Sequence, residues 1–267
     1  MIIPKSCFLS LATLSLFAAA SPGLRAQAPK ADAGAPLFTE DFESGSLNPA
    51  VWDKRVGGMA EVTVQTAQVA HGKSALQIHY PMAANRAYGF AVASHLPESL
   101  KQHGFGRAYV YIAPGMPAGH DVLLTGGSAG FPLSNYLEVG ASGGKNIFLS
   151  FQRRDPKTPP GQETMARGGP YPVGRWFCLE WEFNDQPDKT TVWIDGELAK
   201  EKAFVLSNNP KEDALKEVDP ADGKSTGLVN GFVEFAFGFR PYAAAKGDFD
   251  IYYDDIALDT KRIGPVK

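Results

Sequence analysis

Residues 247–259 read GDFDIYYDDIALD and combine the pattern of a β-strand with five aspartates. Isoleucine, phenylalanine and tyrosine are common in strands, whereas aspartate is depleted there and neighbouring carboxylates repel each other. The apolar residues still predict a strand near the C-terminus. Its acids Asp250, Asp254 and Asp255 need partners, and a hard cation such as calcium binds several carboxylates at once.

Strand-like segments of this kind recur along the whole chain. They alternate in polarity, are rich in β-branched and aromatic residues, and are bounded by Gly, Pro, Asn and Asp. Only PESLKQH (97–103) and NPKEDALKEV (209–218) look helical. About a dozen short strands predict an all-β fold, a jelly roll made of two packed antiparallel sheets. The pair Asp195-Gly196 predicts a tight hairpin, and the Pro/Gly-rich residues 154–174 predict a long loop.

The N-terminal residues have the pattern of a cleavable secretory signal. Lys5 precedes a short apolar run, and Ala-Gln-Ala at 26–28 is a cleavage signal, so residues 1–28 are predicted to be removed. Residues 29–36 are predicted to be a linker, and residues 37–265 a single jelly-roll domain. We therefore expect a secreted or periplasmic protein, without a membrane span and monomeric.

The charge of the chain bears on nucleic-acid binding, and its cysteine content bears on disulfides. After cleavage, 24 basic residues face 29 acidic ones, a net charge of −5, which does not favour nucleic acid. Cys178 is then the only cysteine, so no disulfide can form within the mature chain.

A second acidic stretch, FTEDFESGS (38–46), lies at the other end of the domain. A jelly roll commonly places its first and last strands side by side, so a cation between Glu40, Asp41 or Glu43 and the last strand would tie the two ends together. The alternative is that these acids face water at a sheet edge, where charge discourages aggregation.

Four stretches resemble a known family: FTEDFESGSLNPAVW (38–52), VAHGKSALQIHYP (69–81), FGRAYVYIAPGMPAGH (105–120) and YYDDIALDTKRIGP (252–265). They are similar to secreted jelly-roll proteins of the fungal cellulose-induced type, which are related to glucuronan and alginate lyases of the concanavalin A-like superfamily. The resemblance implies a structural calcium held by the first strand, an early turn and the last strand.

Carried onto this sequence, the resemblance implies a specific ligand set. Glu43 would supply a carboxylate, His71 a backbone carbonyl and Ser74 an oxygen, at a position where the family has an amide side chain. The closing carboxylate would come from Asp254 or Asp255, a choice that the sequence leaves open.

Candidate catalytic residues lie on the central strands. Strand alternation places Arg107, Tyr109 and Tyr111 on one outer face, while Gln152 projects from a later strand and His120 stands at a strand entrance. Arg, Gln, Tyr and His on one sheet face suit a polyuronate lyase, which must neutralise a C5 carboxylate and remove the adjacent proton. We assign Arg107 and Gln152 to the carboxylate, His120 or Tyr109 as base and Tyr111 as acid. The alternative is an ordinary polar outer face.

Two further patterns carry less weight. The tripeptide Gln77-Ile78-His79 matches the Gln-x-His of jelly-roll alginate lyases, but it comes too early in the chain and is interpreted as coincidence. Glu180 and Glu182 share a face and are interpreted as exposed acids rather than a hydrolase pair, and Trp181 and Trp193 as core residues.

The sequence thus predicts a secreted carbohydrate-active protein, a polysaccharide lyase cleaving a polyuronate by β-elimination, stabilised by calcium. The rival is a non-catalytic carbohydrate-binding protein of the same fold, for which exposed tryptophans would be the signature.

Overall fold

The computed structural model describes residues 34–81, 87–132, 136–152, 164–185, 189–203, 231–244 and 246–266. The predicted signal peptide, most of the linker and the predicted helix at 209–218 lie outside these ranges, so those predictions stay untested.

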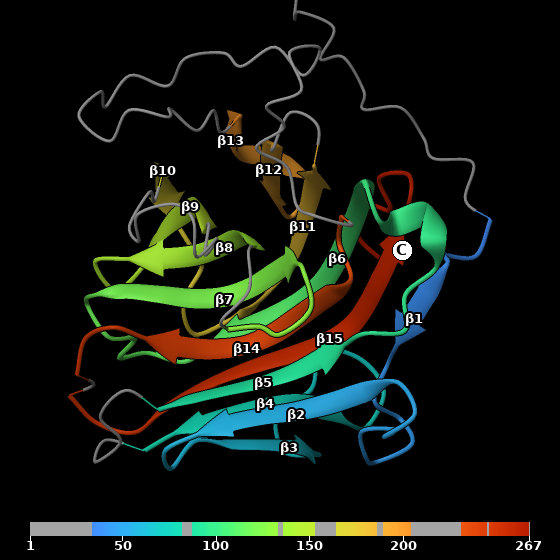
Figure 1. Cartoon of the computed structure of the whole chain (residues 1–267). Coiled ribbons are helices and arrows are strands. Elements are labelled where there is room, and N and C mark those ends of the chain that lie inside the picture. The colour runs from blue at the N-terminus through green and yellow to red at the C-terminus, as the bar shows by residue number, and fades with distance from the viewer. Residues whose placement is uncertain are drawn as a thin grey trace, which may run out of the picture. The chain divides into compact units, whose positions relative to one another are not determined.

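The described residues form two antiparallel sheets, which Figure 1 shows one in front of the other. In order across the sheet, the seven-stranded sheet contains β10 (Thr164–Pro170), β9 (Asn146–Gln152), β8 (Tyr136–Ser142), β7 (His120–Gly127), β14 (Glu234–Pro241), β5 (Tyr88–Ala93) and β2 (Trp52–Gly57). The eight-stranded sheet contains β13 (Glu197–Ala203), β12 (Lys189–Ile194), β11 (Trp176–Asn184), β6 (His103–Ile112), β15 (Phe249–Asp259), β4 (Ala75–Tyr80) and β3 (Glu61–Gln65), with β1 (Phe38–Glu40) also on β15. The predicted jelly-roll sandwich is confirmed.

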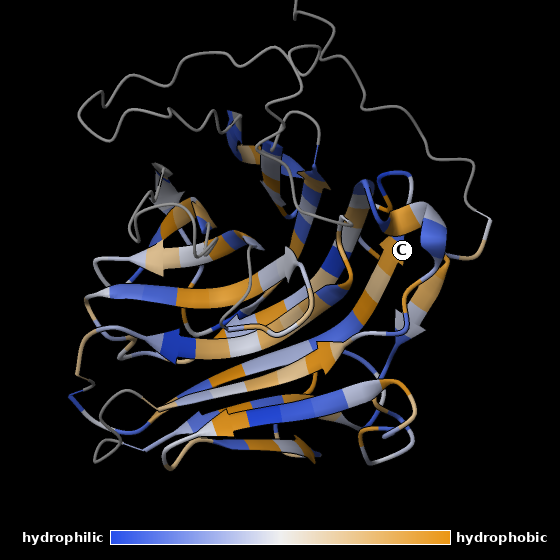
Figure 2. Cartoon of the chain, in the orientation of Figure 1, coloured by the Kyte–Doolittle hydropathy of each residue, from blue (hydrophilic) through white to orange (hydrophobic). Residues whose placement is uncertain are grey.

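The main core lies between the two sheets because their strands alternate in polarity, which Figure 2 shows as interleaved orange and blue segments. On β6, Ala108, Val110 and Ile112 are fully buried, whereas the residues between them are only partly buried. Opposite them, Trp181 packs edge-on against Phe237 of the other sheet, with ring centroids 5.7 Å apart. Strand periodicity therefore predicts the core side of β6 correctly.

The local turn predictions have mixed outcomes. Asp195 and Gly196 have φ values of 51° and 86° and join β12 to β13, which confirms the tight hairpin. The long loop predicted at 154–174 is partly wrong, because its second half forms the strand β10, paired with β9 through backbone hydrogen bonds. Side-chain periodicity misses such a Gly/Pro-rich strand because its pairing does not depend on side chains. The segment at 97–103 contains only the 3₁₀ turn Glu98–Leu100 before β6 begins.

The first and last strands are neighbours, as predicted. Phe38, Thr39 and Glu40 of β1 pair with Leu258, Ala257 and Ile256 of β15. The acidic stretches at the two ends of the domain are thereby brought to one region of the eight-stranded sheet.

Candidate functional site

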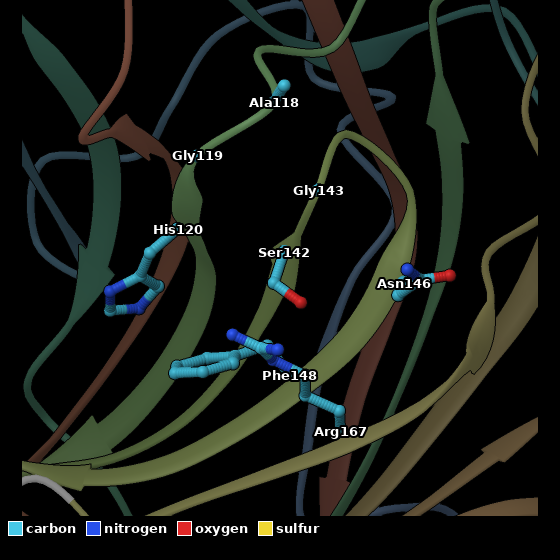
Figure 3. Close-up of a pocket in the computed structure, with 8 residues that line it drawn as sticks. All are labelled: Ala118, Gly119, His120, Ser142, Gly143, Asn146, Phe148 and Arg167. Atoms are coloured by element: carbon cyan, nitrogen blue, oxygen red, sulfur yellow. The ribbon is translucent and has the colours of Figure 1, made fainter.

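A pocket of about 450 Å³ opens on the outer face of the seven-stranded sheet, a volume in the range of ligand sites. Residues of four neighbouring strands and of the turns beside them line it (Figure 3): Ala118, Gly119, His120, Ser142, Gly143, Asn146, Phe148 and Arg167.

Strand register explains why these residues meet. His120 of β7 pairs with Ser142 of β8, and Ser142 pairs with Asn146 of β9, so the three side chains form one row across the sheet. In the next row, Gly140 pairs with Phe148, which pairs with Arg167 of β10. Figure 3 shows the Arg167 side chain extending across Phe148 toward the side of the pocket where His120 and Ser142 lie.

His120 is held by a buried acid in the third row. Its Nε2 lies 2.6 Å from Oε1 of Glu138, whose other oxygen accepts a hydrogen bond of 2.8 Å from the Ser150 hydroxyl. Glu138 is fully buried, whereas the His120 side chain keeps 20% of its surface exposed. A buried carboxylate beside an imidazole stabilises the imidazolium that forms when the ring takes up a proton.

The Gly140 position leaves room for this pair. A Cβ added at Gly140 would lie 2.4 Å from Oε1 of Glu138, so any larger residue there would displace the carboxylate. The imidazole ring also packs against Phe148, with centroids 4.3 Å apart, and stacks on Tyr242 at 4.9 Å and 10°. These contacts fix the plane of the His120 ring.

A second acid, Asp121, follows His120 in the chain but is not among the residues that line the pocket. Asp121 is fully buried, and neither carboxylate oxygen has a hydrogen-bond partner within the described part of the chain. Burial raises its pKa to about 8, with the nearby Glu138 charge adding to the effect and His120 opposing it. Glu138 is therefore the acid that acts on His120.

Replacing Asp121 with asparagine is expected to stabilise the protein, increasingly so at higher pH. Because burial holds the folded-state pKa above the ordinary value of an aspartate, between pH 3.8 and about 8 the folded protein keeps a proton that the unfolded chain has lost. Wild-type stability therefore falls as pH rises through this window, by about 4 kcal/mol between pH 5 and pH 8, and Asp121→Asn removes that loss. Urea unfolding at pH 5 and pH 8 measures the difference in stability between Asp121→Asn and the wild type. An equal difference at both pH values would contradict a buried Asp121 with a raised pKa.

The five predicted catalytic residues do not meet. His120 and Gln152 lie on strands of the seven-stranded sheet, whereas Arg107, Tyr109 and Tyr111 lie on β6 of the eight-stranded sheet. The expectation of one shared sheet face is wrong, because the core separates the outer faces of the two sheets. Alternation shows which side of its own strand a residue occupies but not which sheet the strand joins.

The residues of the β6 group have other partners. Arg107 donates hydrogen bonds of 3.4 Å to the backbone carbonyls of Asp255 and Gly264, and the Tyr109 hydroxyl accepts one of 3.1 Å from the Val266 amide. Burial, with a smaller contribution from Cys178, raises the pKa of Tyr109, which does not suit a general base. Arg107 and Tyr109 therefore hold the C-terminal segment against the sheet.

The C-terminal segment also explains Glu180, which is buried rather than exposed as expected. Both its oxygens bind Arg262, at 3.0 and 2.8 Å, and Oε1 also accepts a bond from the Gly264 amide. The Arg262 guanidinium lies 4.4 Å from the centroid of the Trp193 ring. Trp193 is accordingly on the outer face and not in the core, whereas Trp181 is fully buried as predicted.

The predicted metal ligands gather around the turn at residues 70–74. Oε1 of Glu43 accepts bonds from the Lys73 and Ser74 amides at 2.7 and 2.9 Å. From the other side, Oδ2 of Asp254 accepts bonds from the Ala70 and His71 amides at 2.9 and 3.2 Å. The carboxylates of the first and last strand regions therefore contact the same turn.

The donor set at this turn fits calcium in part. Asp254 is almost fully buried, and burial raises its pKa to about 6. The hydrogen bonds from the two amides oppose this shift but do not cancel it, so they compensate the carboxylate charge only in part. The Asp255 carboxylate instead pairs with Nδ1 of His71. No three His, Cys, Asp or Glu side chains in the described ranges group at metal-binding distances. A cation would thus need backbone, hydroxyl or water oxygens besides the two acids.

Sequence reasoning missed Glu138, Asn146 and Arg167. The alternation in YLEVGAS (136–142) was a usable signal for Glu138, since it places this residue on the face opposite Leu137 and Val139. Arg167 gave no such signal, because it lies within the Gly/Pro-rich stretch interpreted as a loop.

Among the known structures that match this chain, two cover most of it and have TM-scores above 0.5. The first is a cellulose-induced protein, Cip1, with a TM-score of 0.58, 14% identity and coverage of 86% of this chain and 100% of that chain. The second is an endo-β-1,4-glucuronan lyase from the fungus Trichoderma reesei, with a TM-score of 0.56, 15% identity and coverage of 85% and 96%. This chain has their fold.

The resemblance inferred from four sequence stretches is thus confirmed at the level of the fold. No family model and no curated protein matches the sequence. Within the described ranges, no helix has the length and apolar character needed to cross a bilayer.

Proposed function

We propose that this protein is a secreted, carbohydrate-active lyase that cleaves an acidic polysaccharide by β-elimination in the pocket on the seven-stranded sheet. The observation that carries the proposal is the convergence of His120, backed by the buried Glu138, with Arg167 on one pocket. The glucuronan lyase of the same fold supports this class of substrate, and the signal-like residues 1–28 support export.

Each group has a role that its chemistry supports. The Arg167 guanidinium binds the C5 carboxylate of a uronate, which disperses the negative charge that develops when the C5 proton leaves. His120 takes that proton, and Glu138 stabilises the imidazolium formed. The electron pair of the C5–H bond forms the C4=C5 double bond as the C4–O bond breaks. The imidazolium then supplies a proton to the departing oxygen.

The reaction class is tested by an absorbance assay. β-Elimination creates an unsaturated uronide that absorbs in the near ultraviolet, and hydrolysis does not. Glucuronan, alginate and pectate are incubated separately with the mature protein, and an absorbance rise with at least one of them is expected. No rise with any of the three would overturn the lyase proposal.

We also propose that calcium binds at the 70–74 turn, with Glu43 and Asp254 as its carboxylates. Calcium would lower the electrostatic cost of burying Asp254 and would tie the first and last strand regions to the turn between them.

Removing calcium is expected to lower the melting temperature, because an ion that binds only the folded state stabilises it by mass action. At a free concentration about 100 times Kd, the loss on adding EDTA is about 2.7 kcal/mol. Thermal melts with EDTA and with excess calcium measure this. Glu43→Gln should melt at the same temperature in both buffers, and an EDTA-insensitive wild type would contradict the calcium site.

A further inference from the structure

A row of partly exposed side chains crosses the outer face of the eight-stranded sheet, opposite to the pocket. Gln77 pairs with Tyr252, Tyr252 pairs with Tyr111, and Tyr111 pairs with Trp176. The four residues therefore stand next to one another on the neighbouring strands β4, β15, β6 and β11. At about 4.8 Å between strands, this aromatic row is about 14 Å long, enough for several linked sugars.

The three rings of the aromatic row support one another. Tyr111 contacts Trp176 and Tyr252, each with a centroid distance of 5.8 Å, and Trp176 lies 6.5 Å from Tyr252. All three keep part of their surface exposed. Rings held in this way present a rigid apolar surface with polar tips, which suits the C–H-rich faces and the hydroxyls of hexose rings.

Hydrogen-bonding groups border the rings on one side. Oδ1 of Asp250 accepts a bond of 2.8 Å from the Gln77 amide and lies 2.9 Å from Nδ1 of His79. These side chains are partly exposed and already oriented by one another, so a sugar hydroxyl can bind them with little loss of conformational entropy.

The charges near the aromatic row disfavour an acidic ligand. Asp250 and the exposed Glu61, which pairs with His79, place carboxylates beside it. At the other end, Arg175 already binds Asp195 at 2.9 Å. A polyuronate would meet like charge there, whereas a neutral glycan would not.

We propose that the aromatic row binds a neutral, hexose-based polysaccharide chain, as a glycan surface separate from the pocket. Such a surface would hold the protein on a neutral matrix while the opposite sheet acts on an acidic one. The proposal does not depend on the lyase proposal, because it uses different residues on a different sheet.

Isothermal titration with cellohexaose, mannohexaose and a glucuronan hexamer tests this surface. The wild type is expected to bind at least one neutral hexasaccharide. Trp176→Ala and Tyr252→Ala should each weaken that binding about 10-fold or more, the loss expected for one ring contact. Trp193→Ala, on the same sheet outside the row, is the matched control and should bind as the wild type does. Thermal melts verify that each variant is folded.

Three outcomes would overturn the proposal: no binding of either neutral hexasaccharide at millimolar concentration, unchanged binding by both folded row variants, or row-dependent binding of the glucuronan hexamer alone. His120→Ala should bind the neutral hexasaccharide normally, so failure of the lyase proposal and failure of this one give different results.

Discussion

Replacing His120 with alanine is expected to lower the rate of β-elimination by about 10²–10⁴-fold, the usual contribution of a positioned general base. In the proposed mechanism the ring is the proton acceptor, and the Glu138 carboxylate 2.6 Å away stabilises its charged form. The appearance of unsaturated uronide under saturating polysaccharide measures the effect, and substrate binding should change much less than the rate.

The control for this variant is another histidine with the same kind of partner. His103 lies 2.7 Å from Oε1 of Glu182, but on the eight-stranded sheet. His103→Ala should keep the wild-type rate, and Glu138→Gln should lower the rate less than His120→Ala does, because the ring remains. Equal activity of His120→Ala and the wild type would remove this residue from the mechanism.

The largest loss of stability is expected for Arg262→Ala. This change leaves Glu180, 1% exposed, without the cation that binds both its oxygens, and breaking a buried pair from one side costs about 3 kcal/mol. For a domain of this size the melting temperature should fall by about 6–12 °C. Thermal melts monitored by circular dichroism measure the change.

Two further variants show whether the unpaired, buried charge of Glu180 causes the loss of stability in Arg262→Ala. Arg175→Ala removes an exposed ion pair with Asp195 and should cost at most about 0.5 kcal/mol. Adding Glu180→Gln to Arg262→Ala should recover part of the loss, because a neutral amide is less costly to bury than an unpaired carboxylate. If Arg175→Ala and Arg262→Ala destabilise equally, the C-terminal segment is not held by Glu180.

The fold followed from the sequence because its signals are local. Alternation on β6 places Ala108, Val110 and Ile112 in the core, and Asp195-Gly196 specifies its own hairpin through positive φ angles. The sequence did not predict β10, because its Gly and Pro residues do not favour a strand. This strand forms through its backbone pairing with β9.

Three aspartates of the last strand show the limit of local reasoning about a site. Asp250 binds Gln77 and His79, Asp254 binds the 70–74 turn, and Asp255 pairs with His71. One shared cation was the simplest prediction for them, yet their side chains reach different partners, and β15 has a register shift between Asp254 and Ala257.

The candidate pocket was only partly predictable for a related reason. His120 was identified from its chemistry, but its partner Glu138 and the opposing Arg167 come from strands whose order across the sheet no local pattern encodes. Because the sequence does not encode the order of strands in a sheet, Arg107 was wrongly predicted to belong to the site. It instead holds the C-terminal segment.

The central claim is that acidic-sugar chemistry belongs to the seven-stranded sheet. A crystal structure of His120→Ala soaked with a glucuronan oligosaccharide tests it most directly. We predict a uronate in the pocket, with its carboxylate on Arg167 and its C5 facing the space left by the imidazole. A uronate bound instead beside Arg107 and Tyr109 on the eight-stranded sheet would contradict the account.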